Sequence, residues 1–476
     1  MPVATGQRDL EGAIAITRFG LGARAGEIGE AVRDPRGWLK AQVRREGAEP
    51  FSTNGEGSTQ RLIEFRDYRR QRAMAEQAGS PPADGSGRKD DPVMKARQFV
   101  RDNTTGDILG RVQVAAQTPA GFRERWALFW ANHFTVSAVK LQVAGLVGPF
   151  ENEAIRPRVF GRFVDLLGAA ETHPAMLLYL DQAQSVGPNS RAAQFQRRRG
   201  TREGGGPARG LNENLAREIL ELHTVGVDGG YTQADVTEFA RALTGLSIAG
   251  PRDAGVEGVV FRAQTHEPGA RTVMGVLYGD GGKEQASAIL ADLAARPQTA
   301  RFVCTKIARH FVADDPPPAL VARLERAWLS TDGDLARVAE ALIDAPEAWE
   351  PFPAKLKTPY EFLVSSYRAL GGEPRGIGQV AGVLGGLGQR PFGAPSPKGW
   401  PDEAAPWAAS DALVKRMQFA QQIAAVAGPR VQDPSALATL TLGARLGQAS
   451  RIAIARAESR AEAVALLLMT PEFQRR

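Results

Sequence analysis

Residues 212–223 carry more side chains capable of chemistry than any other predicted helix. The segment reads NENLAREILELH, and its polar residues are Asn212, Glu213, Asn214, Arg217, Glu218, Glu221 and His223. A carboxylate here could act as a base or ligand, and Arg217 could neutralise an anionic group or orient that carboxylate. A solvated helix face explains the pattern equally well, because Arg217 lies four residues from both Glu213 and Glu221 and could form ion pairs with them.

The spacing within this segment limits metal binding. On a straight α-helix, at about 100° per residue, Glu218 and His223 lie about 140° apart and cannot bind one metal ion together. A metal centre would need several of the upstream histidines to meet carboxylates in the fold, namely His133, His173, His223 and His266 with Glu218, Glu221 or Asp181. The sequence leaves such convergence open, so we assign no metal ligand and leave the cofactor unknown.

Two further histidines have distinctive local contexts. His133 shares one side of its predicted helix with Trp126 and Trp130, so it could be a base in an aromatic-lined pocket. It could equally be a core histidine bonded to a backbone carbonyl. His266 precedes the turn formed by residues 267–270 (EPGA), and it could serve function or shape that turn.

Other common chemistries lack support in the sequence. The one cysteine, Cys304, excludes an internal disulfide and a multi-thiolate metal site, and its apolar helical context predicts an inert buried thiol. There is no Gly-x-Ser-x-Gly elbow and no phosphate-binding glycine loop. The net charge is +6, of which +5 falls in residues 182–210, a glycine- and arginine-rich segment that has only Phe195 as an aromatic residue. We therefore expect no nucleic-acid partner.

The elements that must position these residues are mostly helices. Apolar residues at helical spacing predict a mainly α fold, with one large helical unit over residues 1–476. Individual helices are predicted at 212–225, 284–295, 299–313, 319–330, 334–345 and 359–370, and two further starts are predicted by Thr118-Pro119 and by the capping pair of Thr232 and Asp235. The exceptions are an exposed loop at 74–93, a flexible basic loop at 182–210, a β-hairpin at 256–278 and an irregular segment at 371–409.

Location follows from what the sequence lacks. The N-terminal residues contain no basic region followed by an apolar run, so no export signal is visible. No stretch approaches the roughly 18 apolar residues of a membrane span. We expect a cytoplasmic protein without a membrane span.

Several long motifs resemble one bacterial family, called domain of unknown function 1800. They are ITRFGLG (16–22), FWANHFTVS (129–137), GLNENLAREILELHTVGVDGGYTQADVTEFARALTG (210–245), HEPGARTVMG (266–275), KLKTPYEFLVSSYRAL (355–370), PKGWPDEAAPW (397–407) and LLLMTPEFQRR (466–476). The resemblance runs nearly end to end. The chain departs from the family pattern at Leu246 (usually Trp), Arg296 (usually His) and Gln182 (usually Asn), which puts any site needing those groups in doubt.

The resemblance implies a partner more than a reaction. The family has no established reaction, but its members are often encoded beside an exported family, domain of unknown function 1501, that resembles sulfatases and phosphatases. The product of a neighbouring gene is therefore the implied partner. Family positions matched here are His133, Asn212, Glu213, Asn214, Arg217, Glu218, Glu221, His223, Gly230, Tyr231 and His266.

Two functional hypotheses follow. The first is an enzyme with a pocket around the 212–223 helix. Its predicted catalytic residues are Glu218, Glu221, His223, His133 and His266, and its predicted substrate-binding residues are Asn212, Asn214, Arg217, Tyr231 and Trp130. The alternative is a non-catalytic accessory protein that binds the product of a neighbouring gene. The first requires carboxylates and a histidine around a common cavity.

Overall fold

The computed structural model describes residues 2–52, 56–77, 92–199, 210–250, 253, 258–352 and 355–476. Its first half contains α1 (Pro2–Ile14), the π-helical turn η1 (Ala15–Phe19), α2 (Glu27–Ala31), α3 (Pro35–Lys40), α4 (Ser58–Gln77), α5 (Pro92–Gln117), α6 (Gly121–His133), α7 (Leu141–Ala144), α8 (Val147–Phe150), η2 (Glu151–Ile155), η3 (Arg156–Arg158), α9 (Phe163–Glu171), α10 (Pro174–Tyr179), η4 (Gln182–Gln184), α11 (Arg191–Arg199), α12 (Asn214–Glu218), η5 (Ile219–His223) and α13 (Gln233–Leu243).

The second half adds strands and further helices. The strands are β1 (Leu246–Ile248), β2 (Val259–Phe261), β3 (Arg271–Val273) and β4 (Val276–Tyr278). The helices are α14 (Lys283–Ala295), α15 (Pro297–Phe311), α16 (Pro318–Ser330), α17 (Leu335–Asp344), η6 (Pro346–Trp349), α18 (Pro359–Ala369), η7 (Ile377–Gln379), α19 (Ala381–Gly386), η8 (Ala405–Trp407), α20 (Ser410–Ala427), η9 (Gly428–Arg430), α21 (Pro434–Leu442), η10 (Gly443–Arg445), α22 (Gln448–Ala455), α23 (Arg460–Met469) and α24 (Pro471–Gln474). The predicted mainly α fold is confirmed.

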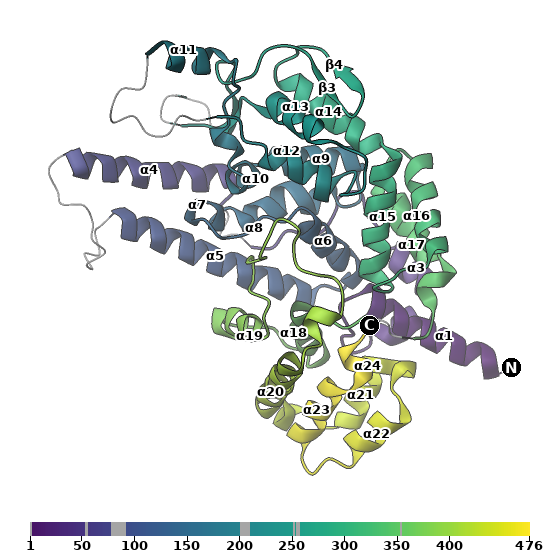
Figure 1. Ribbon diagram of the computed structural model, residues 1–476. Coiled ribbons are helices and arrows are strands. Elements are labelled where there is room, and N and C mark those ends of the chain that lie inside the picture. The colour runs from purple at the N-terminus through teal and green to yellow at the C-terminus, as the bar shows by residue number, and fades with distance from the viewer. Residues whose placement is uncertain are drawn as a thin grey trace.

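The helices surround a centrally placed α6, as Figure 1 shows. Helices α4 and α5 run side by side and project from the body, whereas α15, α16 and α17 stand together on the opposite side. Helices α20 to α24, in yellow-green and yellow, form a group at the bottom of the view, close to α18 and α1. Among the described helices, none has both the length and the apolar composition needed to cross a membrane.

The aromatic face of α6 explains its central position. Phe122, Trp126 and Trp130 are fully buried, and the Trp126 ring stacks on Phe160 with centroids 5.9 Å apart. Phe311 at the end of α15 lies 5.7 Å from the same tryptophan ring. Burial of such large rings supplies much of the free energy of a core. The buried apolar side chains form one cluster from the first helix to the last, and the single folding unit over residues 1–476 stays a prediction.

Helix starts were the most predictable feature. Thr232 and Asp235 form the predicted capping box at the start of α13. The five helices predicted between residues 284 and 370 are found within two residues of their predicted bounds. The start predicted at Thr118 is wrong, because its hydroxyl accepts from the Ala120 backbone and α6 begins only at Gly121.

The predicted β-hairpin over 256–278 is wrong in its pairing. Residues 259–261 pair with β1, before them in the chain, and not with the strand after the 267–270 turn. The hairpin is formed by β3 and β4 across Met274 and Gly275, which both have positive φ values, 47° and 82°. That backbone matches a two-residue type I′ turn, which suits the strand twist. Residues 256 and 257 of the predicted hairpin lie outside the described residues.

The three predicted irregular segments contain more helix than expected. Helix α4 continues to Gln77 and α5 begins at Pro92, so the rest of the 74–93 loop lies outside the described residues. Residues 191–199 of the 182–210 segment form α11, because the Ser190 hydroxyl accepts from the Ala193 backbone and the breaker residues come later. Residues 200–209 lie outside the described residues. The 371–409 segment is mostly irregular but contains α19 and two short 3₁₀ turns.

Candidate functional site

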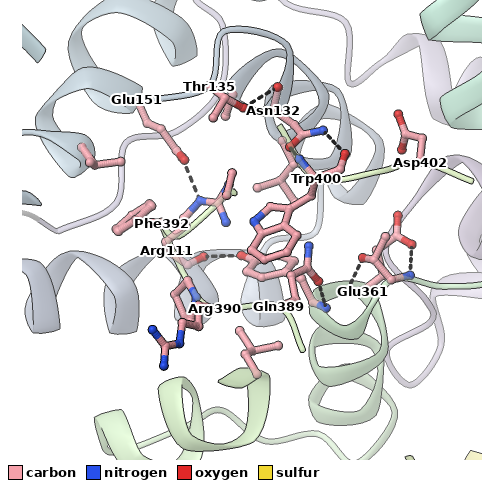
Figure 2. A pocket seen from close by; sticks show the side chains of 18 of the residues that line it. Arg111, Asn132, Thr135, Glu151, Glu361, Gln389, Arg390, Phe392, Trp400 and Asp402 are labelled. Carbon is pink, nitrogen blue, oxygen red and sulfur yellow. Dashed lines mark hydrogen bonds and ion pairs between the residues drawn. The ribbon is translucent and has the colours of Figure 1, made fainter. Parts of the chain in front are cut away.

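A cavity of about 110 Å³ lies between α5, α6, α15, α18 and the irregular segment 389–402. We call it the His310 pocket. Figure 2 shows Arg111 and Glu151 at one end, Glu361 and Asp402 at the other, and the indole of Trp400 between them. Its volume is enough for several water molecules or a small ligand, since one water needs about 10–15 Å³.

Asn132 attaches the irregular segment to α6. Its Nδ2 donates to the Trp400 carbonyl at 2.9 Å, and its Oδ1 accepts from the Trp400 backbone nitrogen at 2.8 Å. Gly399 makes this approach possible, because its φ is +84° and an added Cβ would lie 2.6 Å from the Asn132 carbonyl oxygen. The amide therefore fixes Trp400 and the following residues over the pocket.

A histidine–aspartate pair lines one wall. His310, in the last turn of α15, lies with its Nδ1 2.7 Å from Oδ1 of Asp402, and both side chains are largely buried. Because an ionised carboxylate can only accept hydrogen bonds, Nδ1 of His310 carries the proton and donates a hydrogen bond to Asp402. The other ring nitrogen, Nε2, is buried and has no hydrogen-bond partner among the described residues.

The charges around this pair favour a neutral imidazole beside an ionised carboxylate. Burial lowers the pKa of His310 below its ordinary value, and this outweighs the opposite effect of Asp402. Burial alone would raise the pKa of Asp402, but the neighbouring His310, Lys355 and Arg476 hold it well below its usual range. At neutral pH the Nε2 lone pair of His310 is therefore available to accept a proton.

Glu361 forms a second buried charge network at the same end. Its carboxylate accepts from Arg125, from Nε of Arg476 at 3.1 Å and from the Thr358 backbone at 2.9 Å. Burial opposes ionisation of Glu361, but the two arginines lower its pKa to about 2. Nη1 of Arg125 also donates to the Gly20 carbonyl at 2.7 Å. Nε of Arg125 is buried without a partner within the described ranges.

The opposite end holds Arg111 and Glu151. Nε of Arg111 donates to Glu151 at 2.9 Å, and its guanidinium lies 4.9 Å from the Tyr360 ring centroid and 5.6 Å from that of Phe392. Arg390 lies at the exposed rim. Its guanidinium forms no ion pair with a carboxylate in the part of the chain that is described. The pocket therefore combines aromatic walls with paired charges inside and a cation at its mouth.

The predicted helix 212–225 has a different geometry from the one its sequence suggests. Residues 214–218 form an α-helix, but 219–223 form the π-helical turn η5. In a π-helix, hydrogen bonds join residues i and i+5, so Glu218 and His223 lie one turn apart along the same side. The expected separation of about 140° is therefore wrong, and His223 contributes to the electrostatic field at Glu218.

This turn brings together what we call the histidine–glutamate cluster: His133, Glu171, Glu218 and His223. Nδ1 of His223 lies 2.7 Å from Oε1 of Glu171, with both side chains fully buried. Nε2 of His133 lies 3.1 Å from the His223 carbonyl, and the two rings have centroids 5.9 Å apart. Three of these four residues were predicted as catalytic from the sequence, whereas Glu171 was not.

The histidine–glutamate cluster contains several buried polar atoms without a well-aligned partner. Both carboxylate oxygens of Glu171, both ring nitrogens of His223 and Nδ1 of His133 are in this condition among the described residues. Burial keeps the pKa of His133 well below its ordinary value, so this imidazole is neutral. Burial, with Glu221 and Glu171, raises the pKa of Glu218. Such atoms are uncommon in folded proteins and mark a place for water or a proton.

Phe129 lies close to one histidine of the cluster and to the histidine of the His310 pocket. The Phe129 ring centroid is 6.1 Å from that of His133 and 5.3 Å from that of His310. The cluster residues are not part of the lining of the pocket. Within the described ranges, no group of three or more histidine, cysteine, aspartate or glutamate side chains is arranged to hold a metal ion.

The other predicted site residues are dispersed. Arg217 binds Glu213 at 3.3 Å, which is one of its two expected ion pairs, and Gln233 at 2.8 Å. Glu221, the other expected partner, instead accepts from the Tyr231 hydroxyl at 3.3 Å. Nδ2 of Asn212 donates to the Leu180 carbonyl, so it ties down the chain before the helix.

Three predicted residues have no place at a shared cavity. Asn214 is exposed. Trp130 is fully buried beside His133, with ring centroids 5.4 Å apart, and its Nε1 has no partner among the described residues. His266 lies elsewhere, with Nδ1 2.7 Å from the Thr244 carbonyl. This contact joins the segment after β2 to the end of α13, and the two roles expected for His266 stay predictions.

The sequence reasoning missed the residues that line the cavity. His310 ends an amphipathic helix and is the one histidine downstream of the hairpin, whereas Asp402 lies in an irregular proline-rich segment. Glu361 had a detectable signal, because Thr358-Pro-Tyr-Glu361 matches a capping box, which the structure contains. That pattern explains the helix start without indicating the two arginines that bind the same carboxylate.

Comparison with known proteins gives one result. A family model described as "Protein of unknown function (DUF1800)" matches residues 14–475, which confirms the resemblance found in the motifs. No curated protein and no solved structure matches the chain. The comparisons therefore supply no reaction, substrate or ligand.

Proposed function

Since the chain belongs to the DUF1800 family of proteins of unknown function, its activity must be inferred from its own residues, and we propose that it is an enzyme. In this proposal His310 is a general base in the His310 pocket, and Asp402 orients it. The observation that carries the proposal is the 2.7 Å contact between Nδ1 of His310 and Asp402, with Nε2 buried and unpartnered at a cavity wall. A carboxylate that fixes the tautomer and orientation of an imidazole is a recurrent catalytic arrangement.

The electrostatics of the pair suit proton transfer at neutral pH. Burial lowers the pKa of His310, so the neutral imidazole predominates and can accept a proton from a substrate or a bound water molecule. The proton is stabilised on the ring by the ionised Asp402 carboxylate, which Lys355 and Arg476 keep deprotonated. The cycle closes when Nε2 returns the proton to a leaving group or to water.

Water is the expected nucleophile if the reaction is a hydrolysis. Two hydroxyls from threonine line the pocket, and both are engaged. Thr135 donates to the Asn132 carbonyl at 2.6 Å, and Thr358 accepts from the Glu361 backbone in the capping box. No serine or cysteine is among the lining residues in the described part of the chain.

The substrate class follows from the size and charge of the site. The cavity of about 110 Å³ accepts only a small molecule or one end of a larger one. Arg390 at the mouth and the free Nε of Arg125 inside would bind an anionic group, and Trp400 and Tyr360 would contact a planar or apolar part. We therefore propose a small polar substrate that carries a carboxylate or phosphate.

The test uses chromogenic esters, phosphates and glycosides of p-nitrophenol with matched histidine variants. His310→Gln should lower any activity found by about 10²–10⁴-fold, the usual contribution of a general base. His173→Gln is the control, because His173 also contacts a carboxylate, Glu153 at 3.0 Å, but lies outside the pocket. Activity should fall as pH drops through the lowered pKa of His310. Equal rates in both variants would show that His310 is not the base.

A binding measurement makes the test independent of the choice of substrate. Acetate and inorganic phosphate, added separately, should shift the imidazole NMR signals of His310 and leave those of His173 unchanged. Arg390→Ala should weaken this response, since it removes the cation at the mouth. If neither anion moves the His310 signals, the proposed substrate class is wrong.

A role for the predicted site around residues 212–223, a partner protein and a cytoplasmic location also stay proposals. The histidine–glutamate cluster could serve a second acid–base step through Glu218, whose pKa is raised mainly by burial. The product of a neighbouring gene as partner, and a cytoplasmic location, are tested by co-purification and by fractionation of the native cells.

A further inference from the structure

A groove of about 1010 Å³ lies on a different face, between the C-terminal end of α5, the end of α18, η7 with α19, and α20. We propose that this groove binds an amphipathic helix of a partner protein whose flanks carry acidic residues. The volume is at the upper limit of small-molecule pockets, which range from about 300 to 1,000 Å³, so a peptide segment fits it better than a metabolite.

Its floor is apolar and partly open to solvent. Tyr367 and Ile423 are half-buried, Phe419 is buried, and Val426 is 69% exposed. An exposed valine within a concave apolar surface is a feature of protein interaction sites. The concave shape disfavours a flat membrane surface as the occupant.

Its rim is cationic. Arg24, Arg375 and Arg430 lie around the groove, whereas Glu373 is the one carboxylate among its described lining residues. The carboxylate of Glu373 already accepts from Gln117. The guanidinium groups of Arg375 and Arg430 form no hydrogen bond or ion pair with any described residue, and both residues are exposed. These two charges are complementary to acidic side chains on an occupant.

The elements around the groove decide the form of the occupant. Its walls are helices and turns, and no sheet edge borders it, so an added strand would find no backbone partner within the described residues. Recognition by side chains along two helical walls is typical of a helix that presents apolar residues at i, i+3, i+4 and i+7. Between these anchors the acidic residues would face Arg375 and Arg430.

The position of α19 gives such binding a route to the proposed active site. Val383 of α19 lines the groove, and the next residue, Leu384, lines the His310 pocket. An occupant that contacts α19 therefore touches an element shared by both cavities. The docking proposal itself does not depend on the function of the pocket.

The experiment compares two synthetic peptides by fluorescence anisotropy with the full-length protein. Both have leucine at i, i+3, i+4 and i+7, and the other positions are glutamate in one peptide and lysine in the other. We expect the glutamate peptide to bind and the lysine peptide to bind at least about tenfold more weakly. Raising the ionic strength should weaken the glutamate complex, because exposed charges are screened.

Variants locate the binding. The double variant R375E/R430E should lose the glutamate peptide by about tenfold or more and gain affinity for the lysine peptide. R451E/R456E is the control, since it changes the net charge equally at exposed positions of α22 and the following residue, away from the groove. Val426→Ser should weaken the binding of both peptides, because it removes an apolar contact from the floor of the groove.

Three results would overturn the proposal. They are no binding of the glutamate peptide, equal binding of the two peptides, and equal effects of the two charge-reversal variants, which includes the case in which neither variant loses binding. Light scattering and sedimentation with mixed phosphatidylserine and phosphatidylcholine vesicles complete the test. A dimer, or vesicle binding, that R375E/R430E abolishes while the peptide remains unbound would assign the groove to a second copy or to a membrane instead.

Discussion

Replacing Glu361 by glutamine tests the charge network that closes the His310 pocket. The carboxylate is 7% exposed and binds both Arg125 and Arg476, so the substitution leaves two buried guanidinium groups without their anion. The pKa of Glu361 falls from 4.5 to about 2 in the folded protein, which corresponds to about 3 kcal/mol at about 1.36 kcal/mol per pKa unit. This agrees with the roughly 3–5 kcal/mol lost when one partner of a buried ion pair is removed.

The pH dependence gives this prediction its sign. A lowered carboxylate pKa stabilises the folded state above pH 4.5, and that contribution disappears as the pH falls through about 2. The difference in unfolding free energy between wild type and E361Q should therefore be about 3 kcal/mol at pH 7 and about 1 kcal/mol smaller at pH 4. Urea unfolding followed by tryptophan fluorescence measures both values.

Glu403→Gln provides the control for E361Q. Glu403 is a 45% exposed carboxylate near the same segment, 3.9 Å from Arg309. Its loss should cost less than about 1 kcal/mol at either pH, as for other exposed pairs. The reasoning is refuted if E361Q is no less stable than E403Q at pH 7, or if its deficit is the same at both pH values.

Four further predictions concern single groups. Asp402→Asn should lower the pKa of His310 further, because the negative charge of Asp402 raises this pKa in the wild type. A histidine NMR titration that finds a higher pKa of His310 in the variant would contradict the assigned pairing. Glu218→Gln should leave stability at pH 7 unchanged or increased, because a raised carboxylate pKa favours folding at low pH and opposes it once the pH passes the ordinary value. Urea unfolding that shows a clear loss in E218Q would instead give this carboxylate a structural role. An NMR titration of the carboxyl carbons should find a lower pKa for Glu218 in Glu221→Gln, and no change would exclude the coupling. Cys304 is buried with its pKa raised by burial, so Ellman's reagent should label it only after unfolding, and rapid native labelling would contradict this burial.

The sequence predicted the helices well because their signals are local. The apolar spacing in 297–311 and the capping pair Thr232 and Asp235 act over a few residues, so the helix starts and the mainly α fold follow directly. The strand pairing depended on contacts between separate segments. Residues 259–261 have no local feature that selects β1 over β3, and the prediction chose the wrong partner.

The candidate site was predictable only in part, for two physical reasons. The π-helical turn at 219–223 shifts the hydrogen bonds by one residue, and side-chain spacing carries no sign of that shift. The His310 pocket is formed by residues far apart in the chain, such as Arg125 and Glu361, which are separated by 236 positions. Each of them looks like an ordinary helix residue, and their chemistry exists only once the helices are packed.

The contacts of Arg476 affect when the pocket can form during synthesis. The Arg476 backbone nitrogen donates to the Lys355 carbonyl at 2.9 Å, and its side chain binds Glu361 and the His310 carbonyl. Domains fold progressively from the N-terminus as the ribosome proceeds, so α6, α15 and α18 emerge long before this arginine. Until residue 476 leaves the exit tunnel, Glu361 has one cation instead of two. The nascent protein therefore carries an incomplete pocket after its main helices have emerged, and residue 476 completes it.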